Sequence, residues 1–314
     1  MPDPELTARF AAELARLWPG EGRIGLAVSG GPDSLALLLL AQVAFPGRIA
    51  AATVDHGLRP EAAAEAAMVA RLCRQLGVPH ATLKVKVGAG NLQSRARAAR
   101  YAALADWMER DRIAALLTAH HADDQAETLL LRLGRASGVA GLAGVRARGL
   151  VAGTRLPLLR PLLGWRRSEL AGVVAAAGIE PVQDPSNIDD RFDRARIRKA
   201  IAGAEWLDVP ALAASAANLA DADVALDWAA AREWQECVSQ APMGLIYRPQ
   251  APRAVALRVI ARIVRELDGE EPRGGAAARL FDSLLARQPA SIGKLAARAG
   301  PDGWTFTKAP QRRG

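Results

Sequence analysis

The residues best suited to chemistry lie in a short loop rich in glycine and hydroxyl groups, SGGPDS at positions 29–34. The loop follows an apolar run at 24–28 that predicts a strand, and it precedes an apolar stretch at 34–44 that predicts a helix. Two glycines allow backbone amides to face inward as an anion nest, and a helix N-terminus behind them favours negative charge. We therefore predict a phosphate-binding loop formed by Ser29, Gly30, Gly31, Pro32, Asp33 and Ser34. It matches neither GxxxxGKS/T nor GxGxxG, and an ordinary strand-to-helix turn is the alternative.

A second polar cluster, HHADDQAET at 120–128, follows another predicted strand, IAALLTA at 113–119. Asp124 and Glu127 are three positions apart, so on one helical turn both point to the same face. There they could clamp an ammonium group while one of them acts as a base. The alternative is that the acids only complement the dipole of the helix N-terminus. Histidines with acids also suggest a metal site, but adjacent histidines on a helix diverge in direction, so zinc is not expected.

Two further clusters supply candidate contacts to a nucleotide and to phosphates. The run at 49–54 ends in Asp55 and His56, at the position where dinucleotide-binding folds contact the ribose. Asp55 could instead cap the turn that follows. Arg97 and Arg100 lie three positions apart on one face of a predicted helix and could bind the α-phosphate of a nucleotide or a phosphate of RNA. A charged face turned to solvent is the alternative.

A group of arginines, Arg194, Arg196 and Arg198, alternates with apolar residues after a turn at 184–187. Such a cluster suits the phosphates of a nucleic acid. The arginines could instead form ion pairs with acids nearby in the sequence: Asp189, Asp190 and Asp193.

The order of these elements indicates an α/β fold: an open, mostly parallel, Rossmann-like sheet with helices on both faces. Strands and helices alternate over the first half of the chain, and consecutive strand–helix units form parallel sheets. A strand at 80–87 starts at His80, for which no role is expected. In open parallel sheets, ligands bind beyond the carboxyl ends of the strands, which is where the polar clusters are predicted to lie.

The second half of the chain has a different pattern. From about residue 206 the strand signal disappears, and amphipathic stretches at 211–238 and 253–267 predict helices. We therefore expect a catalytic domain at 1–208 and a smaller, mainly helical substrate-binding domain at 209–314, with a small hairpin near its end.

The composition predicts a soluble, cytoplasmic protein. The 314 residues carry a net charge of +8, which suits a partner with a phosphate backbone, although compositional bias is an alternative. Cys73 and Cys237 are widely separated, so neither a disulfide framework nor a thiolate metal site is expected. The N-terminus lacks the pattern of a signal peptide, and the densest apolar stretch, 35–44, is too short to span a bilayer.

The motifs together resemble a known enzyme family. SGGPDS is similar to the SGGxDS pyrophosphate loop of the N-type ATP pyrophosphatases, the PP-loop superfamily, which cleave ATP between the α and β phosphates. Four further segments resemble the tRNA(Ile)-lysidine synthetases within that superfamily: VDHGLR at 54–59, GNLQSRARAARY at 90–101, HHADDQAET at 120–128 and RARIR at 194–198. The resemblance runs in order over about residues 22–200, with Ala195 where similar enzymes often have Asn.

This resemblance implies ligation of free lysine to carbon 2 of the wobble cytidine in the CAU anticodon of tRNA(Ile). The reaction would pass through an adenylated tRNA and give lysidine, AMP and pyrophosphate. ATP and Mg²⁺ are implied as cofactors, with Asp33 as a metal ligand, and no obligate protein partner is expected. The implied catalytic residues are Asp33, Arg100, Asp124, Glu127 and Arg194, and the nucleotide would be held by the loop at 29–34 with Asp55 and His56.

Three other functions remain open at this point. A tRNA thiolase would use the same loop, but its chemistry calls for paired cysteines. An amide-forming ligase that adenylates a carboxylate is disfavoured by the HHADDQAET segment and by the missing glutamine-hydrolysing domain. A nucleotide- or RNA-binding module without chemistry is the third alternative.

Overall fold

The computed structural model describes residues 2–57, 61–85, 92–182, 193–272 and 274–309. The chain forms two compact units, Met1–Ala220 and Asp221–Gly314. The first unit extends past the predicted 1–208 domain because it includes the beginning of the long helix α9, Val209–Cys237.

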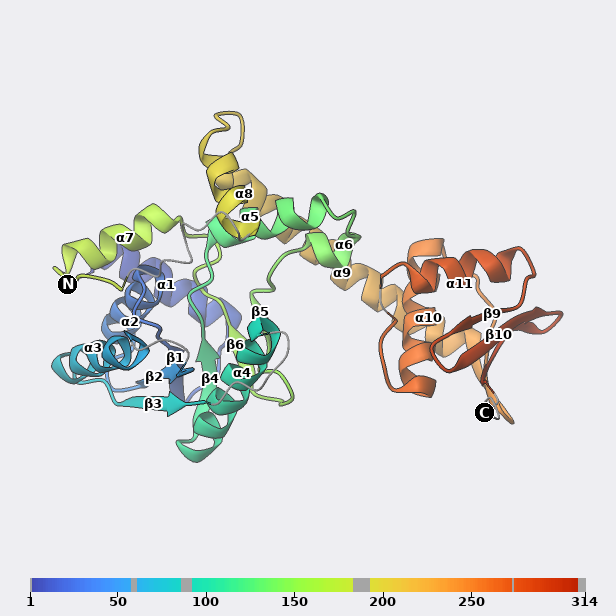
Figure 1. The fold of residues 1–314 in the computed structure, drawn as a ribbon, viewed down its shortest axis with the longest axis horizontal. Helices are drawn as coiled ribbons and strands as arrows, with labels where there is room; N and C mark the ends of the chain where they lie inside the picture. The colour runs from blue at the N-terminus through green and yellow to red at the C-terminus, as the bar shows by residue number, and fades with distance from the viewer. Residues whose placement is uncertain (1, 58–60, 86–91, 183–192, 273, 310–314) are drawn as a thin grey trace. The chain divides into compact units, whose positions relative to one another are not determined.

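The first unit is built on an open sheet with strand order β3-β2-β1-β4-β6-β5 (Figure 1). Its strands are β1 Arg23–Ala27, β2 Ile49–Asp55, β3 His80–Lys84, β4 Ile113–Leu117, β5 Arg148–Leu150 and β6 Pro157–Leu159. Only the pairing of β5 with β6 is antiparallel. From β1 the chain continues to β2 and β3 on one side, and it then returns to β4 on the other side of β1. The carboxyl end of β1 is therefore the switch point of the sheet, the position where ligands bind in open α/β folds.

Helices cover both faces of this sheet. They are α1 Pro4–Leu17, α2 Pro32–Ala44, α3 Glu61–Gln75, α4 Leu92–Arg110, α5 Ala122–Leu133, α6 Val139–Leu142, α7 Arg167–Ala176 and α8 Asp193–Ala202. Leu26 of β1 packs in one core with α1, α2, α3 and α7, whereas its neighbour Ala27 packs in another with Leu104 and Trp107 of α4. The predicted mostly parallel α/β fold is therefore confirmed (Figure 1).

The helix that follows the phosphate loop is the most deeply buried in this unit. Residues 34–41 of α2 are all buried, because α1 and α7 pack against it on the side away from the sheet. A helix covered on nearly all sides needs an apolar sequence without a polar face, which explains the run LALLLLA. The loop at its N-terminus is thus anchored on a rigid element.

The second unit combines helices with an antiparallel sheet of strand order β7-β8-β11-β10-β9. Its elements after α9 are β7 Val238–Ala241, β8 Gly244–Tyr247, α10 Arg253–Asp268, α11 Ala276–Leu285, β9 Ala290–Ile292, β10 Leu295–Gly300 and β11 Gly303–Lys308. Tyr247 and Trp304 meet edge to face in its core, with ring centroids 5.9 Å apart.

The prediction of a mainly helical second domain is therefore incomplete. The helices and the hairpin β10–β11 are present, but three more strands complete a sheet. These strands, β7, β8 and β9, have only three or four residues each, too few for an alternating pattern to stand out in the sequence. Across the described residues, no helix combines the length and apolar composition needed to span a bilayer.

Candidate active site

The SGGPDS loop connects β1 to α2 and is folded around the hydroxyl group of Ser34. The backbone N–H of Ser29 donates to Ser34 Oγ at 3.1 Å, and this hydroxyl donates to the carbonyl of Gly31 at 3.0 Å. Gly30 has a φ of +90°, a conformation that favours glycine, and Pro32 occupies the first turn of α2. The loop therefore has the strand, left-handed glycine and helix N-terminus that a phosphate cradle requires.

Asp33 lies in the first turn of α2 and faces the start of α5. Its Oδ2 is 3.4 Å from Nε2 of His121, whose side chain is fully buried. Asp124 approaches the same nitrogen, with its Oδ2 3.6 Å away. One imidazole thus joins a carboxylate of the phosphate loop to a carboxylate of the HHADDQAET segment, two motifs that are far apart in the sequence.

His121 also fixes the start of α5. As the N-cap residue it accepts a hydrogen bond from the backbone of Asp124 at 3.4 Å, and Asp124 accepts one from the backbone of His121 at 3.2 Å. Burial disfavours a charged ring, but the nearby carboxylates of Asp33 and Asp124 outweigh it and raise the pKa of His121. Asp124 thus stabilises the N-terminus of α5, as the alternative interpretation predicted, and it also lies close to the ring of His121.

His120 has the opposite electrostatic character. Its Nδ1 lies 3.0 Å from Thr118 Oγ1. Burial lowers the pKa of His120 to about 4, and the arginines Arg160, Arg100 and Arg97 add to this effect against the pull of Asp124. His120 is therefore neutral near pH 7.

Glu127 lies one turn further along α5 and is buried between two arginines. Its Oε1 accepts from Arg198 Nε at 2.9 Å and from Arg167 Nη2 at 3.3 Å. Its Oε2 is buried with no hydrogen-bond partner among the described residues. Asp123, which precedes Asp124 in the sequence, accepts a hydrogen bond from the backbone N–H of Arg167 at 2.8 Å. The charge of Glu127 is thus compensated by two arginines, while its second oxygen is buried without a described partner.

The arginine group of α8 divides between two environments. Arg194 is exposed, and Arg196 pairs with Asp193 at 2.5 Å, as the ion-pair interpretation predicted for that residue. Arg198 instead reaches Glu127 of α5, consistent with the packing of α8 beside α5 (Figure 1). The other predicted partners, Asp189 and Asp190, lie outside the described residues.

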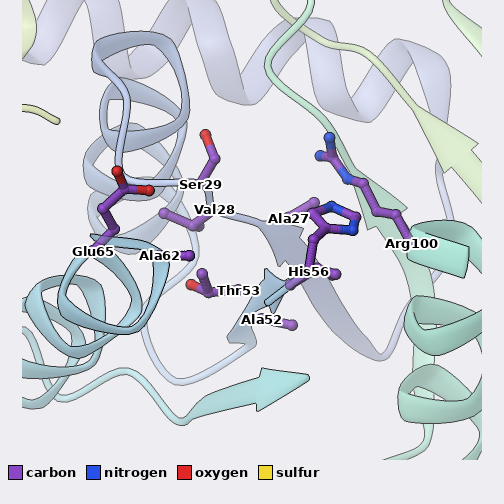
Figure 2. A pocket seen from close by; sticks show the side chains of 10 residues that line it. Ala27, Val28, Ser29, Ala52, Thr53, His56, Ala62, Glu65 and Arg100 are labelled. Carbon is purple, nitrogen blue, oxygen red and sulfur yellow. The ribbon is translucent and has the colours of Figure 1, made fainter. Parts of the chain in front are cut away.

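A cavity of about 300 Å³ opens beside the loop at the carboxyl ends of β1 and β2 (Figure 2). Figure 2 shows His56 and Arg100 on one side of it and Ser29 and Glu65 on the other. Its lining is Ala27, Val28, Ser29, Ala52, Thr53, Val54, His56, Ala62, Glu65 and Arg100. Small apolar residues with a few polar groups form the kind of cleft that takes a flat, polar-edged molecule such as a nucleoside.

The predicted nucleotide contacts at the end of β2 have distinct environments. Asp55 accepts a hydrogen bond from Gly57 N–H at 2.9 Å, which is the turn cap considered as the alternative. His56 lines the cavity, its Nδ1 is buried without a hydrogen-bond partner in the described structure, and burial together with Arg100 lowers its pKa. His80 Nε2 lies 2.9 Å from Oγ1 of Thr53, a residue of the cavity lining, although no role was expected for His80.

The residues at the loop fit a metal ion that is held mainly by phosphates. Asp33 Oδ1 is buried and has no hydrogen-bond partner among the residues that the structure describes. Within the same residues, no group of three or more His, Cys, Asp or Glu side chains could hold a metal by itself. Mg²⁺ in nucleotide sites commonly takes one or two carboxylates and completes its shell with phosphates and water. A single free carboxylate oxygen beside a phosphate cradle matches that pattern.

Comparisons with known proteins agree with this geometry. Residues 4–205 match the family model ATP_bind_3, a PP-loop domain. The chain is 49% identical over 310 residues to tRNA(Ile)-lysidine synthase of Novosphingobium aromaticivorans, covering 98% of this chain and 94% of that protein. It is 40% identical over 302 residues to the protein of the same name from Zymomonas mobilis, covering 94% and 91%.

Among solved structures, the U34-tRNA thiolase NcsA of Methanococcus maripaludis is similar with a TM-score of 0.56. That similarity covers 71% of this chain and 81% of the thiolase at 14% identity, so it shows a shared fold only. The matches in sequence extend over nearly the whole length of both proteins. The chain therefore belongs to the tRNA(Ile)-lysidine synthase family, a family of C–N bond-forming ligases built on the PP-loop domain.

Proposed function

We propose that this chain ligates free lysine to carbon 2 of the wobble cytidine in the CAU anticodon of tRNA(Ile), using ATP. The observation that carries the proposal is the position of His121 between Asp33 and Asp124, at 3.4 and 3.6 Å. This contact brings a residue of the nucleotide-binding loop within reach of the acids suited to a lysine amine. A ligase needs both in one site, because the activated base must meet its nucleophile there.

In the first step, the oxygen on carbon 2 of the cytidine attacks the α-phosphate of ATP, and pyrophosphate leaves. The loop at 29–34 holds the leaving pyrophosphate with backbone amides and the N-terminus of α2. The adenosine would occupy the cavity beside β1 and β2, where Arg100 in the lining would contact the α-phosphate. Mg²⁺, when bound through Asp33 and the phosphates, would neutralise charge that develops on the leaving group.

In the second step, the ε-amine of lysine attacks carbon 2 of the adenylated cytidine, and AMP leaves. The amine must first lose a proton, because only its neutral form has a free electron pair. Asp124 is the proposed base, since its side chain is partly accessible and lies beside His121. Glu127 would receive the ammonium group through Oε2, while Arg167 and Arg198 hold Oε1. Arg194, exposed on α8, would contact a phosphate of the tRNA.

The cysteines argue against sulfur transfer on the same fold. Cys73 is fully buried in the core of the first unit, and burial raises the pKa of its thiol to about 12. Cys237 is buried in the core of the second unit. A thiolate nucleophile needs an accessible thiol of low pKa, and an Fe–S cluster is commonly held by four thiolates, whereas the chain has two cysteines.

The test is incorporation of labelled lysine into unmodified tRNA(Ile) with a CAU anticodon, in the presence of Mg²⁺ and ATP. We expect ATP-dependent incorporation by the unaltered protein and none by Asp33→Asn. Asp106→Asn, which neutralises an exposed carboxylate on α4, is the matched control and should retain activity. If pyrophosphate is released in response to tRNA but no lysine enters it, adenylation stands and lysine is the wrong nucleophile. If the folded protein binds ATP and shows neither signal, the proposed function is wrong.

A further inference from the structure

A second cavity of the first unit is lined partly by the same helix, α4, that contributes Arg100 to the nucleotide cavity. It has a volume of about 290 Å³ and is lined by Ser94, Arg97, Ala98, Tyr101, Leu150, Ala152, Leu158 and Arg160. Arg97 and Arg100 are one helical turn apart on α4, so the two cavities open next to each other along the same helix face. None of the roles proposed above for the loop or the acids uses this cavity.

Arg160 is the central feature of this cavity. Its side chain is 7% exposed, Nη1 donates to the carbonyl of Arg146 at 2.6 Å, and Nε is buried with no hydrogen-bond partner in the described structure. A buried guanidinium with an unsatisfied N–H is costly unless an anion approaches it. The lining contains a second cation, Arg97, and no carboxylate. The cavity therefore favours an anionic ligand.

The other lining groups limit what this anion can be. Arg97 stacks on the ring of Tyr101, with 4.9 Å between the guanidinium carbon and the ring centroid, so the cation is held in place over the cavity. Leu150 is 60% exposed, and Ala152 and Leu158 continue an apolar wall beside it. Two arginines for a phosphate and an apolar wall for a sugar or a base match a nucleotide better than a free inorganic anion.

We infer that this cavity receives the anticodon-loop nucleotide adjacent to the target cytidine, with its phosphate on Arg97 and Arg160 and its apolar surface on Leu150. This inference rests on the proposed function, because it takes the RNA as the substrate whose cytidine is adenylated beside Arg100. Proteins that bind or modify RNA recognise loop bases that are unstacked and turned outward. A base in this position is kept there more firmly when the protein also binds the neighbouring nucleotides. The pocket at Arg97, one helical turn from Arg100, would bind such a neighbouring nucleotide.

The test measures binding of an isoleucine-tRNA anticodon stem–loop with a CAU anticodon to the full chain. Arg97→Ala should weaken binding about tenfold, the loss of one charge-assisted contact, and should lower the slope of log K against log salt concentration by roughly 0.7. Leu150→Ala should weaken binding less and leave the slope unchanged. Arg95→Ala is the matched control, because Arg95 is an exposed arginine of the same helix that does not line the cavity. ATP affinity should be unaffected in all three variants.

A series of stem–loops, each with one methylphosphonate linkage in the loop, locates the contact. For the unaltered protein, one neutralised linkage next to the target cytidine should weaken binding, and Arg97→Ala should be insensitive to that linkage. Equal binding by Arg97→Ala and Arg95→Ala would overturn the inference. So would additive effects, in which Arg97→Ala and each neutral linkage weaken binding independently of one another. If these binding results hold but no lysine enters the tRNA, the pocket stands and the proposed ligation fails.

Discussion

Oδ2 of Asp33 lies 3.4 Å from Nε2 of His121, although Asp33 lies at the start of α2, which follows β1, and His121 caps α5, which follows β4. The contact is possible because β1 and β4 are parallel neighbours, so the loops at their carboxyl ends meet. His121 is fully buried and also caps α5, which fixes the position of its ring. His121 therefore adds a side-chain contact between the phosphate loop and Asp124 of α5.

Replacing His121 with Asn should separate its two roles. Asn is a good N-cap residue, so the start of α5 should persist, while the smaller side chain at this buried position should lower the free energy of unfolding by about 1–3 kcal/mol. Its side chain is too short to reach Asp33, so kcat for lysine incorporation should fall by about 10- to 100-fold, a common loss for a residue that orients reacting groups. Single-turnover kinetics and urea unfolding measure the two effects. A variant with unaltered kcat would show that His121 only caps the helix.

Gly30 and Gly31 should respond differently to alanine. Gly30 has a φ of +90°, and an added Cβ would lie 3.1 Å from Val182 Cγ2. Gly31 has a φ of −72°, and its nearest neighbour to an added Cβ, Ser29 Oγ, is 3.8 Å away. Gly30→Ala should therefore lower the free energy of unfolding by about 1–3 kcal/mol, whereas Gly31→Ala should change it by less than about 1 kcal/mol.

Urea unfolding of both variants, with ATP binding by calorimetry, tests this difference. Gly30→Ala should also lose ATP affinity, because a strained loop can no longer direct its amides inward. Equal stability of the two variants would contradict the inference that Gly30 is required by its backbone conformation.

The first unit could be predicted from the sequence because each of its long elements has a simple pattern. The runs at 24–28, 49–54 and 113–119 contain no charged residue and are almost entirely apolar, as is typical of strands buried on both faces, and each is followed by polar residues at its carboxyl end. The second unit lacks such signals. Strand β8 has only four residues and buries two alternating side chains, Leu245 and Tyr247, which is too short a run for the period of a strand to stand out in the sequence.

Site residues could be proposed from the sequence only where a local motif points to them. The loop at 29–34 and the acids Asp124 and Glu127 could be proposed from their spacing, their positions after predicted strands and the family resemblance. Thr53 and Glu65 could not, because they line the nucleotide cavity through the packing of β2 and α3. Arg167 was also missed, since its contact with Glu127 depends on the approach of the N-terminus of α7 to α5. Contacts between distant segments arise from the tertiary structure, and no local pattern records them.

His120 should make the protein less stable in mild acid. Its pKa is about 4 in the folded protein and 6.5 in the unfolded chain, so the unfolded state binds the proton more readily between these values. The free energy of unfolding should therefore decrease as the pH falls from 6.5 towards 4. Burial lowers the pKa of His56 and His80 too, so they act in the same direction.

His120→Gln, which cannot take up this proton, should flatten the acid side of the stability curve. Urea midpoints measured every half unit of pH for both proteins provide the comparison. The variant should retain some acid sensitivity through His56 and His80. A slope identical to that of the unaltered protein between pH 6.5 and 4 would show that His120 is not held neutral by its surroundings.

Arg198→Ala should affect the lysine step more than the adenylation step. Arg198 donates to Glu127 at 2.9 Å, and its loss leaves Arg167 as the one remaining described partner of that buried carboxylate. Glu127 would then shift or take up a proton, and either change would weaken its hold on an ammonium group. We expect the KM for lysine to rise about tenfold while tRNA-dependent release of pyrophosphate continues.

Arg196→Ala is the matched control, because Arg196 lies on the same helix and pairs with the half-exposed Asp193. The KM of this variant for lysine should change less than threefold. If Arg198→Ala lowers pyrophosphate release as much as lysine incorporation, Glu127 serves the tRNA or the nucleotide rather than lysine.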